Sequence, residues 1–260
     1  MNEPLNVERH GAVAWLTLNR PAAGNTIDVA LAEALGAAVA ECARDTALRA
    51  LVITGAGALF CGGGDIRAFT AGDSAAAAID AITSRLHPAI ECLATMPKPI
   101  VTLVNGPAAG AGLGLALIGD IVIAARSAHF TSAYTAIGLT PDGGTSWLLP
   151  RLIGLRRASE MVITNRRVGA EEAERIGLVT RVVDDHQLAD EGAQTANRLA
   201  DSAIGALTSA RHLLATSPGR GLADHLALEA RTIAQSAGGA EGREGIASFL
   251  ERRPPRFDGL

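Results

Sequence analysis

Two glycine-rich segments, 60–67 and 104–114, are the first candidates for a binding or catalytic site. Runs of glycine let the backbone approach a ligand closely and leave N–H groups free to donate hydrogen bonds. In the second segment, an apolar run leads through small residues into a helix that we expect to begin at Gly110. The N-terminus of a helix suits an anion, or a negative charge that develops during a reaction. From the residues alone, an ordinary turn and close helix–sheet packing stay open as alternatives.

Nucleotide binding is not supported by these glycines. Gly55-Ala56-Gly57 begins like a dinucleotide fingerprint, but Phe60 stands where the third glycine belongs, and no helix follows at once. Neither segment contains the Gly-Lys-Ser or Gly-Lys-Thr of a phosphate-binding loop. We therefore expect no nicotinamide cofactor and no bound nucleotide.

Composition excludes further classes of protein. The net charge of −4 and the isoelectric point of about 5.9 argue against a nucleic-acid partner. The three cysteines, Cys42, Cys61 and Cys92, lack the spacing of a disulfide framework or zinc site, so we expect no metal. The longest weakly polar stretch, 108–118, is too short to cross a bilayer, and no secretory signal is visible. These features predict a cytoplasmic protein without membrane contact.

Predicted strands and helices alternate along the chain around the glycine-rich segments. The 260 residues are 48% hydrophobic and only 3% aromatic, which predicts one large core built mainly from Ala, Leu, Ile and Val. We expect strands at 12–18, 49–54, 100–104, 121–124, 128–131 and 178–183. We expect helices at 28–44, 74–96, 110–117, within 145–177, and from 187 to near 252 with a break at 217–219. This order indicates an α/β fold with a helical appendage.

Several longer motifs occur together in a fixed order. They read Phe-Cys-Gly-Gly-Gly-Asp-Ile at 60–66, Asn-Gly-Pro-Ala-Ala-Gly-Ala-Gly at 105–112, Gly-Leu-Thr-Pro-Asp-Gly-Gly at 138–144 and Trp-Leu-Leu-Pro-Arg at 147–151, with further segments at 170–179 and 249–257. In order and spacing they resemble the crotonase superfamily, the enoyl-CoA hydratase/isomerase family, over nearly the whole chain. Residues 141–151 look most like the branch of ring-1,2-epoxyphenylacetyl-CoA isomerases and 3-enoyl-CoA isomerases.

The resemblance implies a fold and partners. The fold would be a crotonase-like spiral of ββα units at 1–190, which carries the acyl-CoA site, and a helical C-terminal trimerisation region at 191–260. The partner would be an acyl-CoA thioester, so coenzyme A enters as part of the substrate and no cofactor is bound permanently. Members of the family form homotrimers, often paired into hexamers.

The resemblance also implies roles for the two glycine-rich segments. In the family, two backbone N–H groups hold the thioester oxygen in an oxyanion hole while an enolate forms, and by motif position these belong to Gly64 and Ala111. Preorganised donors of this kind typically contribute about 10²–10³ in rate each. The neighbouring Gly62, Gly63, Asp65 and Ile66 would contact the substrate, and Arg67 matches a basic position that meets coenzyme A phosphates in some relatives. Asp65 would also order the loop through backbone hydrogen bonds.

The acid/base residues depart from the hydratase pattern. Family hydratases use two glutamates to activate water, but the two corresponding positions here are Gly114 and Tyr134. Glycine accepts no proton, and tyrosine has an ordinary pKa near 10. Tyr134 would instead line the acyl pocket. Asp142 matches an aspartate that does the chemistry in several isomerase branches and in a dehalogenase branch.

These positions predict an isomerase that shifts a double bond in an enoyl-CoA thioester. Asp142 would take a proton from C2 of a 3-enoyl-CoA and return it at C4, and a single acid/base suffices because no water is added. The alternatives are an enoyl-CoA hydratase, a CoA-thioester hydrolase or dehalogenase with Asp142 as nucleophile, and a non-catalytic acyl-CoA-binding relative. Outside the family, Asp142 could simply cap the next helix from a Pro-Asp-Gly turn.

The remaining candidates have structural interpretations. We expect His87 and His129 to be structural or surface residues rather than catalytic ones. Trp147 is expected to serve packing rather than substrate contact.

Overall fold

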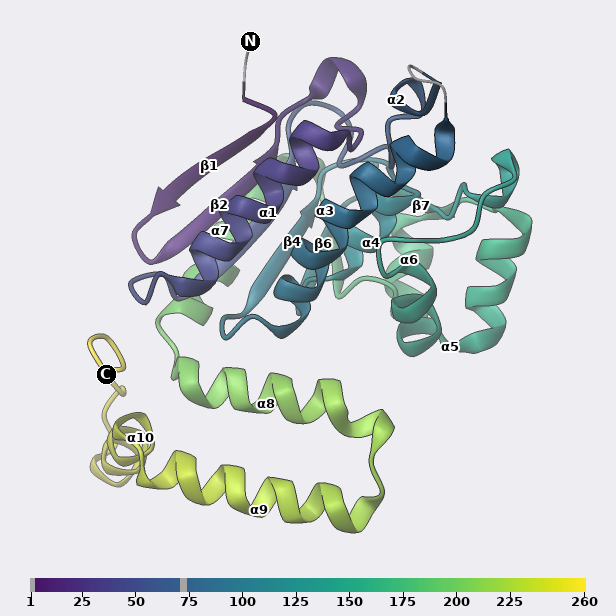
Figure 1. The fold of residues 1–260 in the computed structure, drawn as a ribbon. Helices are drawn as coiled ribbons and strands as arrows, with labels where there is room; N and C mark the ends of the chain where they lie inside the picture. The colour runs from purple at the N-terminus through teal and green to yellow at the C-terminus, as the bar shows by residue number, and fades with distance from the viewer. Residues whose placement is uncertain (1–2, 71–73) are drawn as a thin grey trace.

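The computed structural model describes residues 3–70 and 74–260, and its centre is a six-stranded sheet (Figure 1). The strand order is β1-β2-β3-β4-β6-β9, in which β1 and β2 are antiparallel and all other neighbours are parallel. The strands span Leu5–His10 (β1), Val13–Leu18 (β2), Ala50–Gly55 (β3), Ile100–Val104 (β4), Ile121–Ala125 (β6) and Arg181–Val183 (β9). The expected α/β fold is confirmed.

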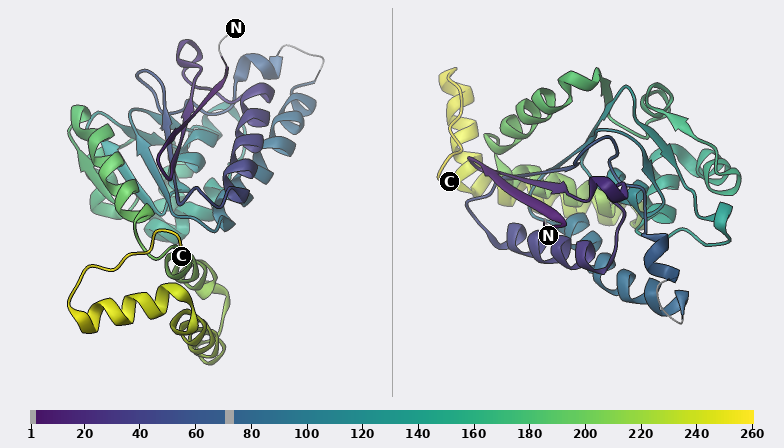
Figure 2. Two further views of the ribbon diagram at one scale, coloured as in Figure 1. Left: turned by 90° about the vertical axis from the view of Figure 1, so that its left-hand side faces the viewer. Right: turned by 90° about the horizontal axis from the view of Figure 1, so that it is seen from above.

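The central strands are apolar because both faces of the sheet are covered. Leu51 and Ile53 of β3 belong to the core cluster beneath α1 (Val29–Arg44) and α3 (Ala75–Thr95). Their neighbours in β3 point the other way, into a second cluster that includes residues of α7 (Leu188–Ala200). Figure 2 shows the helices on opposite sides of the sheet. This alternation within one strand places helices on both faces.

Strand β1 is absent from the elements that the sequence predicts. Only Leu5 of its six residues is buried, so no alternating apolar pattern is visible. The strand forms because its backbone pairs along its whole length with β2, from Leu5 opposite Leu18 to His10 opposite Val13. An edge strand of this kind depends on hydrogen bonds to its neighbour rather than on side-chain burial.

Helix α1 begins where the sequence predicts it. Asp28 is its N-cap residue, and Oδ1 accepts a hydrogen bond from the N–H of Leu31 at 2.8 Å. A cap of this kind typically contributes about 1 kcal/mol. Helix α3 contains Pro88, which lacks the N–H that would donate to the preceding turn, so the helix carries a weak point beside His87.

A smaller group of elements lies beside the main sheet. A three-stranded sheet contains β5 (Ala108–Ala109), β7 (His129–Thr131) and β8 (Val168–Gly169). The accompanying helices are α2 (Ile66–Thr70), α4 (Ala111–Leu117), α5 (Thr145–Thr164) and α6 (Ala170–Ile176). Helix α5 is interrupted at Gly154, whose φ of 77° and ψ of 156° are not helical. These short elements hold the loops that contain the predicted site residues.

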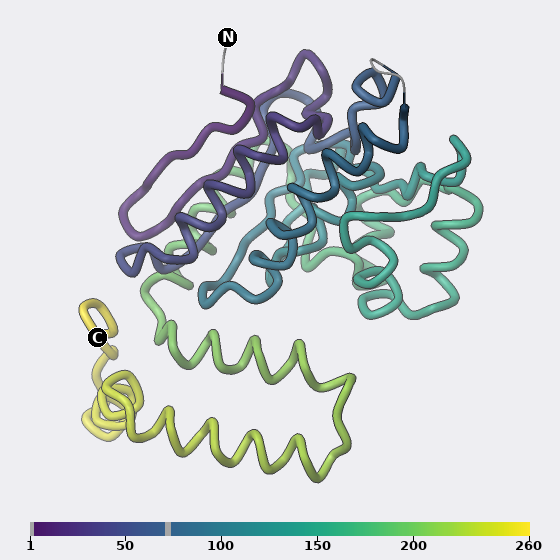
Figure 3. The backbone as a smooth tube through the Cα atoms, viewed as in Figure 1, coloured from purple at the N-terminus to yellow at the C-terminus, as the bar shows by residue number. Residues whose placement is uncertain are grey.

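The last three helices form an arm below the sheet, as the ribbon and the backbone tube show (Figures 1 and 3). They are α8 (Ile204–Thr216), α9 (Leu222–Gly238) and α10 (Ala240–Glu251), with the predicted break at 217–219. Arg211 of α8 joins the arm to the core: its Nε lies 2.6 Å from Oδ1 of Asp120, and its other nitrogens donate to the carbonyls of Leu93 and Met96 at 2.7 Å. Because α7 packs on the sheet, the helices that stand apart begin at 204 rather than at 191.

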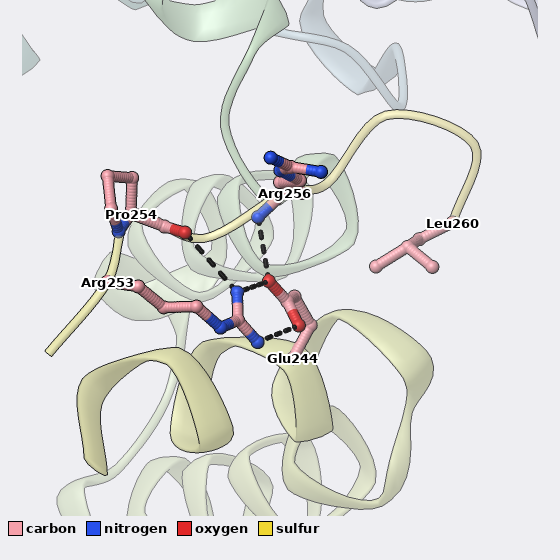
Figure 4. Close-up of a pocket in the computed structure, with 5 residues that line it drawn as sticks. All are labelled: Glu244, Arg253, Pro254, Arg256 and Leu260. Carbon is pink, nitrogen blue, oxygen red and sulfur yellow. Dashed lines mark hydrogen bonds and ion pairs between the residues drawn. The ribbon is translucent and has the colours of Figure 1, made fainter. Parts of the chain in front are cut away.

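The C-terminal tail folds back against α10 (Figure 4). The guanidinium of Arg253 contacts both carboxylate oxygens of Glu244 at 2.6 and 2.9 Å, and the N–H of Arg256 donates to the same carboxylate. The Arg253 hydrogen bond is the main cause that lowers the pKa of Glu244 to about 2. This contact fixes the end of the arm. Within the described residues, no helix is both long and apolar enough to span a membrane.

Candidate active site

A cavity of about 500 Å³ gathers most of the predicted site residues. It lies between α3, the loop that precedes α2, the start of α4 and the segment 133–142. The predicted residues that line it are Gly62, Gly63, Gly64, Ile66, Ala111, Tyr134 and Asp142. Asp65 and Arg67 were also predicted to bind substrate, and they lie outside this lining. Segments more than 70 residues apart along the chain therefore meet at one cavity, as the numbering of these residues shows.

The backbone N–H groups of Gly64 and Ala111 are available to a ligand. Ile27 pairs with the loop on either side of Gly64: its N–H donates to the carbonyl of Gly63 at 2.7 Å, and its carbonyl accepts from Asp65 at 2.9 Å. Ala111 is the first residue of α4. Within residues 3–70 and 74–260, neither N–H donates a hydrogen bond to another group of the chain. Both are thus unpaired donors at the cavity.

Glycine is required where the two loops touch. Gly63 has a φ of +99°, and a Cβ on this residue would lie 2.9 Å from the carbonyl oxygen of Ala109. Real Cβ atoms essentially never approach backbone this closely, so a side chain would push the loops apart. The glycine-rich motif therefore brings Gly64 and Ala111 to the same side of the cavity.

Asp65 orders the first loop from outside the cavity. Its Oδ1 accepts a hydrogen bond from the N–H of Arg67 at 3.1 Å, and its Oδ2 lies 3.0 Å from the guanidinium of Arg20. Burial acts to raise the pKa of Asp65, but the bonds from Arg20 outweigh it and the net direction is downward. The expected ordering of the loop by Asp65 is confirmed. Arg67 is exposed on α2, at the rim of the loop.

The sequence predicts that Gly114 stands where a hydratase carries its first glutamate, and the structure leaves no room for a side chain there. A Cβ on Gly114 would lie 2.1 Å from the carbonyl oxygen of Gly143. Gly143, in turn, approaches Ala111 so closely that its own Cβ would lie 3.4 Å from the Cα of Ala111. The space of the missing carboxylate is therefore filled by the backbone that follows Asp142.

Asp142 is held by Tyr134. The phenol O–H donates to Oδ1 of Asp142 at 2.5 Å, a short bond typical of a hydroxyl on an ionised acceptor. Burial, and then the negative charge of Asp142, raise the pKa of Tyr134 above its ordinary value. Tyr134 therefore stays protonated at neutral pH and acts as a hydrogen-bond donor. It cannot replace the second glutamate as a base.

His87 lies beside the other oxygen of the same carboxylate. Its Nε2 is 3.7 Å from Oδ2 of Asp142 and accepts a hydrogen bond from the N–H of Gly143 at 3.4 Å. The imidazole is half exposed. A half-exposed side chain agrees with the expected surface position, and the structure adds that this surface position adjoins Asp142. No sequence signal could have found it, because 56 residues separate His87 from Gly143.

Comparisons with known proteins identify the family. A family model described as "Enoyl-CoA hydratase/isomerase" matches residues 8–259, and the chain belongs to this family, within the crotonase superfamily. A "Probable enoyl-CoA hydratase" of Rhodobacter capsulatus is 41% identical over 253 residues, with 95% of each chain covered. The 1,2-epoxyphenylacetyl-CoA isomerase of Escherichia coli is 39% identical over 251 residues, again with 95% of each chain covered.

Solved structures agree with this assignment. The crystal structure of an enoyl-CoA hydratase from Polaromonas sp. JS666 has a TM-score of 0.90 and 33% identity, and the match covers 97% of this chain and 98% of that chain. The resemblance seen in the motifs is thus confirmed at the level of the family and the fold. Because similar proteins carry the names of both a hydratase and an isomerase, the reaction has to be argued from the site itself.

Tyr134 is the only tyrosine of the chain, so tyrosinate absorbance reports on this side chain alone. Because its pKa is raised, we expect no tyrosinate in the folded protein at about pH 10, whereas the unfolded chain titrates there. Its contribution to stability should be complete below about pH 10 and be lost as the pH rises through the folded pKa. Spectrophotometric titration should also show a lower pKa for Tyr134 in Asp142→Asn. An identical titration in that variant would contradict the contact.

The Gly114–Gly143 contact predicts a large effect of one methyl group. We expect Gly114→Ala to lower the free energy of unfolding by about 1–3 kcal/mol, because its Cβ overlaps the carbonyl of Gly143. Urea denaturation measures the change. Gly238→Ala is the matched control, since no atom lies within 4 Å of its added Cβ and alanine suits the end of a helix. Equal stability of Gly114→Ala and wild type would contradict the proposed close contact.

Proposed function

We propose that the protein is an acyl-CoA isomerase that shifts the double bond of an uncharged 3-enoyl-CoA into conjugation with the thioester. The observation that carries this proposal is the placement of one carboxylate, Asp142, on the cavity that also exposes the N–H groups of Gly64 and Ala111. Among the described residues that line this cavity, Asp142 is the only carboxylate. A double-bond shift needs one group that takes and returns a proton, and no activated water.

The steps follow from this geometry. With the thioester oxygen between the N–H groups of Gly64 and Ala111, the Asp142 carboxylate removes a proton from C2. The C–H electron pair enters the conjugated system, and the resulting enolate oxygen is stabilised by the two donors. The protonated Asp142 then delivers a proton to C4, which leaves the double bond between C2 and C3. The atoms balance without any co-reactant.

Tyr134 supports this role without sharing the proton transfer. Its O–H holds Oδ1 of Asp142, so the carboxylate keeps one orientation toward the cavity. A hydrogen bond to the charged form of a carboxylate favours that form, which is the state needed to remove a proton. Since the pKa of Tyr134 is raised, the phenol stays available as a donor across the neutral range.

The cavity walls indicate the acyl group. The side chains that line the cavity beyond the polar site are mainly apolar and include Phe69, Ile79, Ile82, Leu86 and Ile137. No lysine, arginine or histidine is present among the described lining residues. Burial of a carboxylate without a cationic partner is costly. We therefore propose an apolar, uncharged acyl chain rather than a dicarboxylic one.

The exposed surface beside the cavity indicates where the coenzyme A part of the substrate would bind. Coenzyme A enters as part of the substrate, and the exposed Arg67 guanidinium at the rim suits its phosphates.

The arm carries large apolar side chains that are mostly exposed, Leu222 at 74%, Phe249 at 82% and Leu250 at 75%. Such surface favours burial against other subunits. We propose a homotrimer or hexamer joined through the arm.

Sedimentation equilibrium tests the assembly. We expect a mass of three or six chains, and a shift toward smaller species in Phe249→Glu, because a buried charge opposes the contact. The control is Glu33→Gln, which lies on α1 rather than on the arm and should leave the mass unchanged. A monomer at micromolar concentration would contradict the proposal.

Absorbance of the conjugated enoyl thioester tests the reaction. We expect wild type to convert an unbranched 3-enoyl-CoA, and Asp142→Asn to lose about 10²–10⁴ in kcat, the range typical of a lost general acid/base. A second substrate of equal length with a terminal carboxylate should give a lower kcat/KM, because the cavity offers it no cation.

The same experiment separates the alternative reactions. Hydration of a 2-enoyl-CoA with no isomerisation would replace the proposal with a hydratase, the activity named for the Rhodobacter capsulatus relative. Affinity for acyl-CoA with no turnover in wild type would indicate a binding protein. Full activity in Asp142→Asn would remove Asp142 from the mechanism.

A further inference from the structure

A second cavity opens on the far side of Asp142. It has a volume of about 390 Å³ and is lined by His87, Glu91, Asp142 and Trp147, together with apolar residues of α3 and α5. Asp142 is the residue that lines both this cavity and the acyl cavity. Its carboxyl group therefore lies between the acyl cavity and the second cavity.

The two oxygens of Asp142 have different partners. Oδ1 accepts from Tyr134, whose raised pKa prevents it from carrying protons away at neutral pH. Oδ2 faces Nε2 of His87 at 3.7 Å. A movement of the imidazole by about 1 Å brings these two atoms to hydrogen-bond distance. Of the two neighbours, only His87 is an imidazole, which can accept a proton at one ring nitrogen and release one from the other.

The imidazole is oriented to accept a proton from Asp142. The N–H of Gly143 donates to Nε2, so Nε2 carries a lone pair and the proton of the neutral ring lies on Nδ1. The side chain of His87 is 50% exposed, in contrast to 30% for Asp142. A proton received at Nε2 can therefore leave from Nδ1 to solvent.

We propose that His87 exchanges the catalytic proton of Asp142 with solvent through the second cavity. This inference rests on the proposed isomerase function. After Asp142 removes a proton from C2, its O–H passes that proton to Nε2 of His87, and Nδ1 releases another to water. The reverse transfer returns a solvent proton to Asp142, which delivers it to C4. His87 is thus a positioning residue that never touches the substrate.

The other charged groups near His87 do not provide the same path. Glu91 lies one turn farther along α3 and lines the second cavity but not the acyl cavity, and among the described residues it forms no hydrogen bond or ion pair with Asp142. The guanidinium of Arg151 lies 3.9 Å from the ring centre of Trp147, where it is held by a cation–π contact. An arginine keeps its proton at neutral pH. The exchange therefore predicts a specific dependence on the imidazole.

Isotope partition measures the exchange. The substrate is a 3-enoyl-CoA with two deuterium atoms at C2, converted in ordinary water, and mass spectrometry gives the deuterium at C4 of the product. Wild type should lose a large part of the transferred deuterium to solvent. His87→Asn and His87→Ala should retain severalfold more, because the proton stays on Asp142 until it returns to the substrate.

Two further measurements separate a proton path from a structural effect. Imidazole added to His87→Ala should restore the loss of deuterium, whereas it should have no effect on wild type. His186→Asn is the matched control, since this exposed histidine lies in a 3₁₀ helix outside both cavities and should leave the partition unchanged. Glu91→Gln should also leave it unchanged.

The outcomes distinguish this inference from the proposed function. Equal deuterium retention in wild type and both His87 variants, with isomerisation intact, would overturn the role of His87 and leave the isomerase in place. Increased retention in Glu91→Gln alone would assign the path to Glu91 and overturn it as well. Isomerisation that persists in Asp142→Asn would instead overturn the function on which the inference rests.

Discussion

The site depends on one close backbone contact, between Gly114 of α4 and the carbonyl of Gly143. Because Gly114 has no side chain, the segment 142–144 lies directly against the start of α4, where a Cβ would overlap the carbonyl at 2.1 Å. This approach places Asp142 on the same cavity as the unpaired N–H of Ala111. The same contact leaves no room for a side chain at position 114, where the family resemblance predicts the first glutamate of a hydratase. It therefore agrees with the proposal that Asp142 is the acid/base.

Around this contact, Asp142 divides two cavities and has one neighbour for each oxygen. Tyr134 donates a hydrogen bond to Oδ1 and stays protonated at neutral pH, since burial and the carboxylate charge raise its pKa. His87 faces Oδ2 with Nε2 of its half-exposed imidazole, 3.7 Å away. The phenol orients the carboxylate, and the half-exposed imidazole is the group through which we propose that its proton exchanges with solvent.

The rest of the fold keeps these groups in register. Strands β3 and β4 are parallel neighbours buried on both faces, and a glycine-rich segment follows the carboxyl end of each. The two loops therefore meet at the same edge of the sheet, where the parallel strands end. Helix α3 crosses beside this edge and supplies both the apolar wall of the acyl cavity and His87. Arg211 ties the arm to Asp120 and to the end of α3. The arm is therefore attached to the same helix that carries the wall of the site.

The α/β order could be predicted from the sequence because apolar strands and helical periods are local patterns. The candidate roles of Gly64, Ala111 and Asp142 came from the resemblance of their motifs to a known family, and all three residues line one cavity. The replacement of the family's glutamates by Gly114 and Tyr134 stays a prediction. Strand β1 escaped prediction because its exposed side chains carry no period, and its pairing with β2 decides it. Only the tertiary structure placed His87 beside Asp142 and filled the space at Gly114 with Gly143. Contacts between distant segments are decided by how helices and loops pack, and no local spacing records that packing.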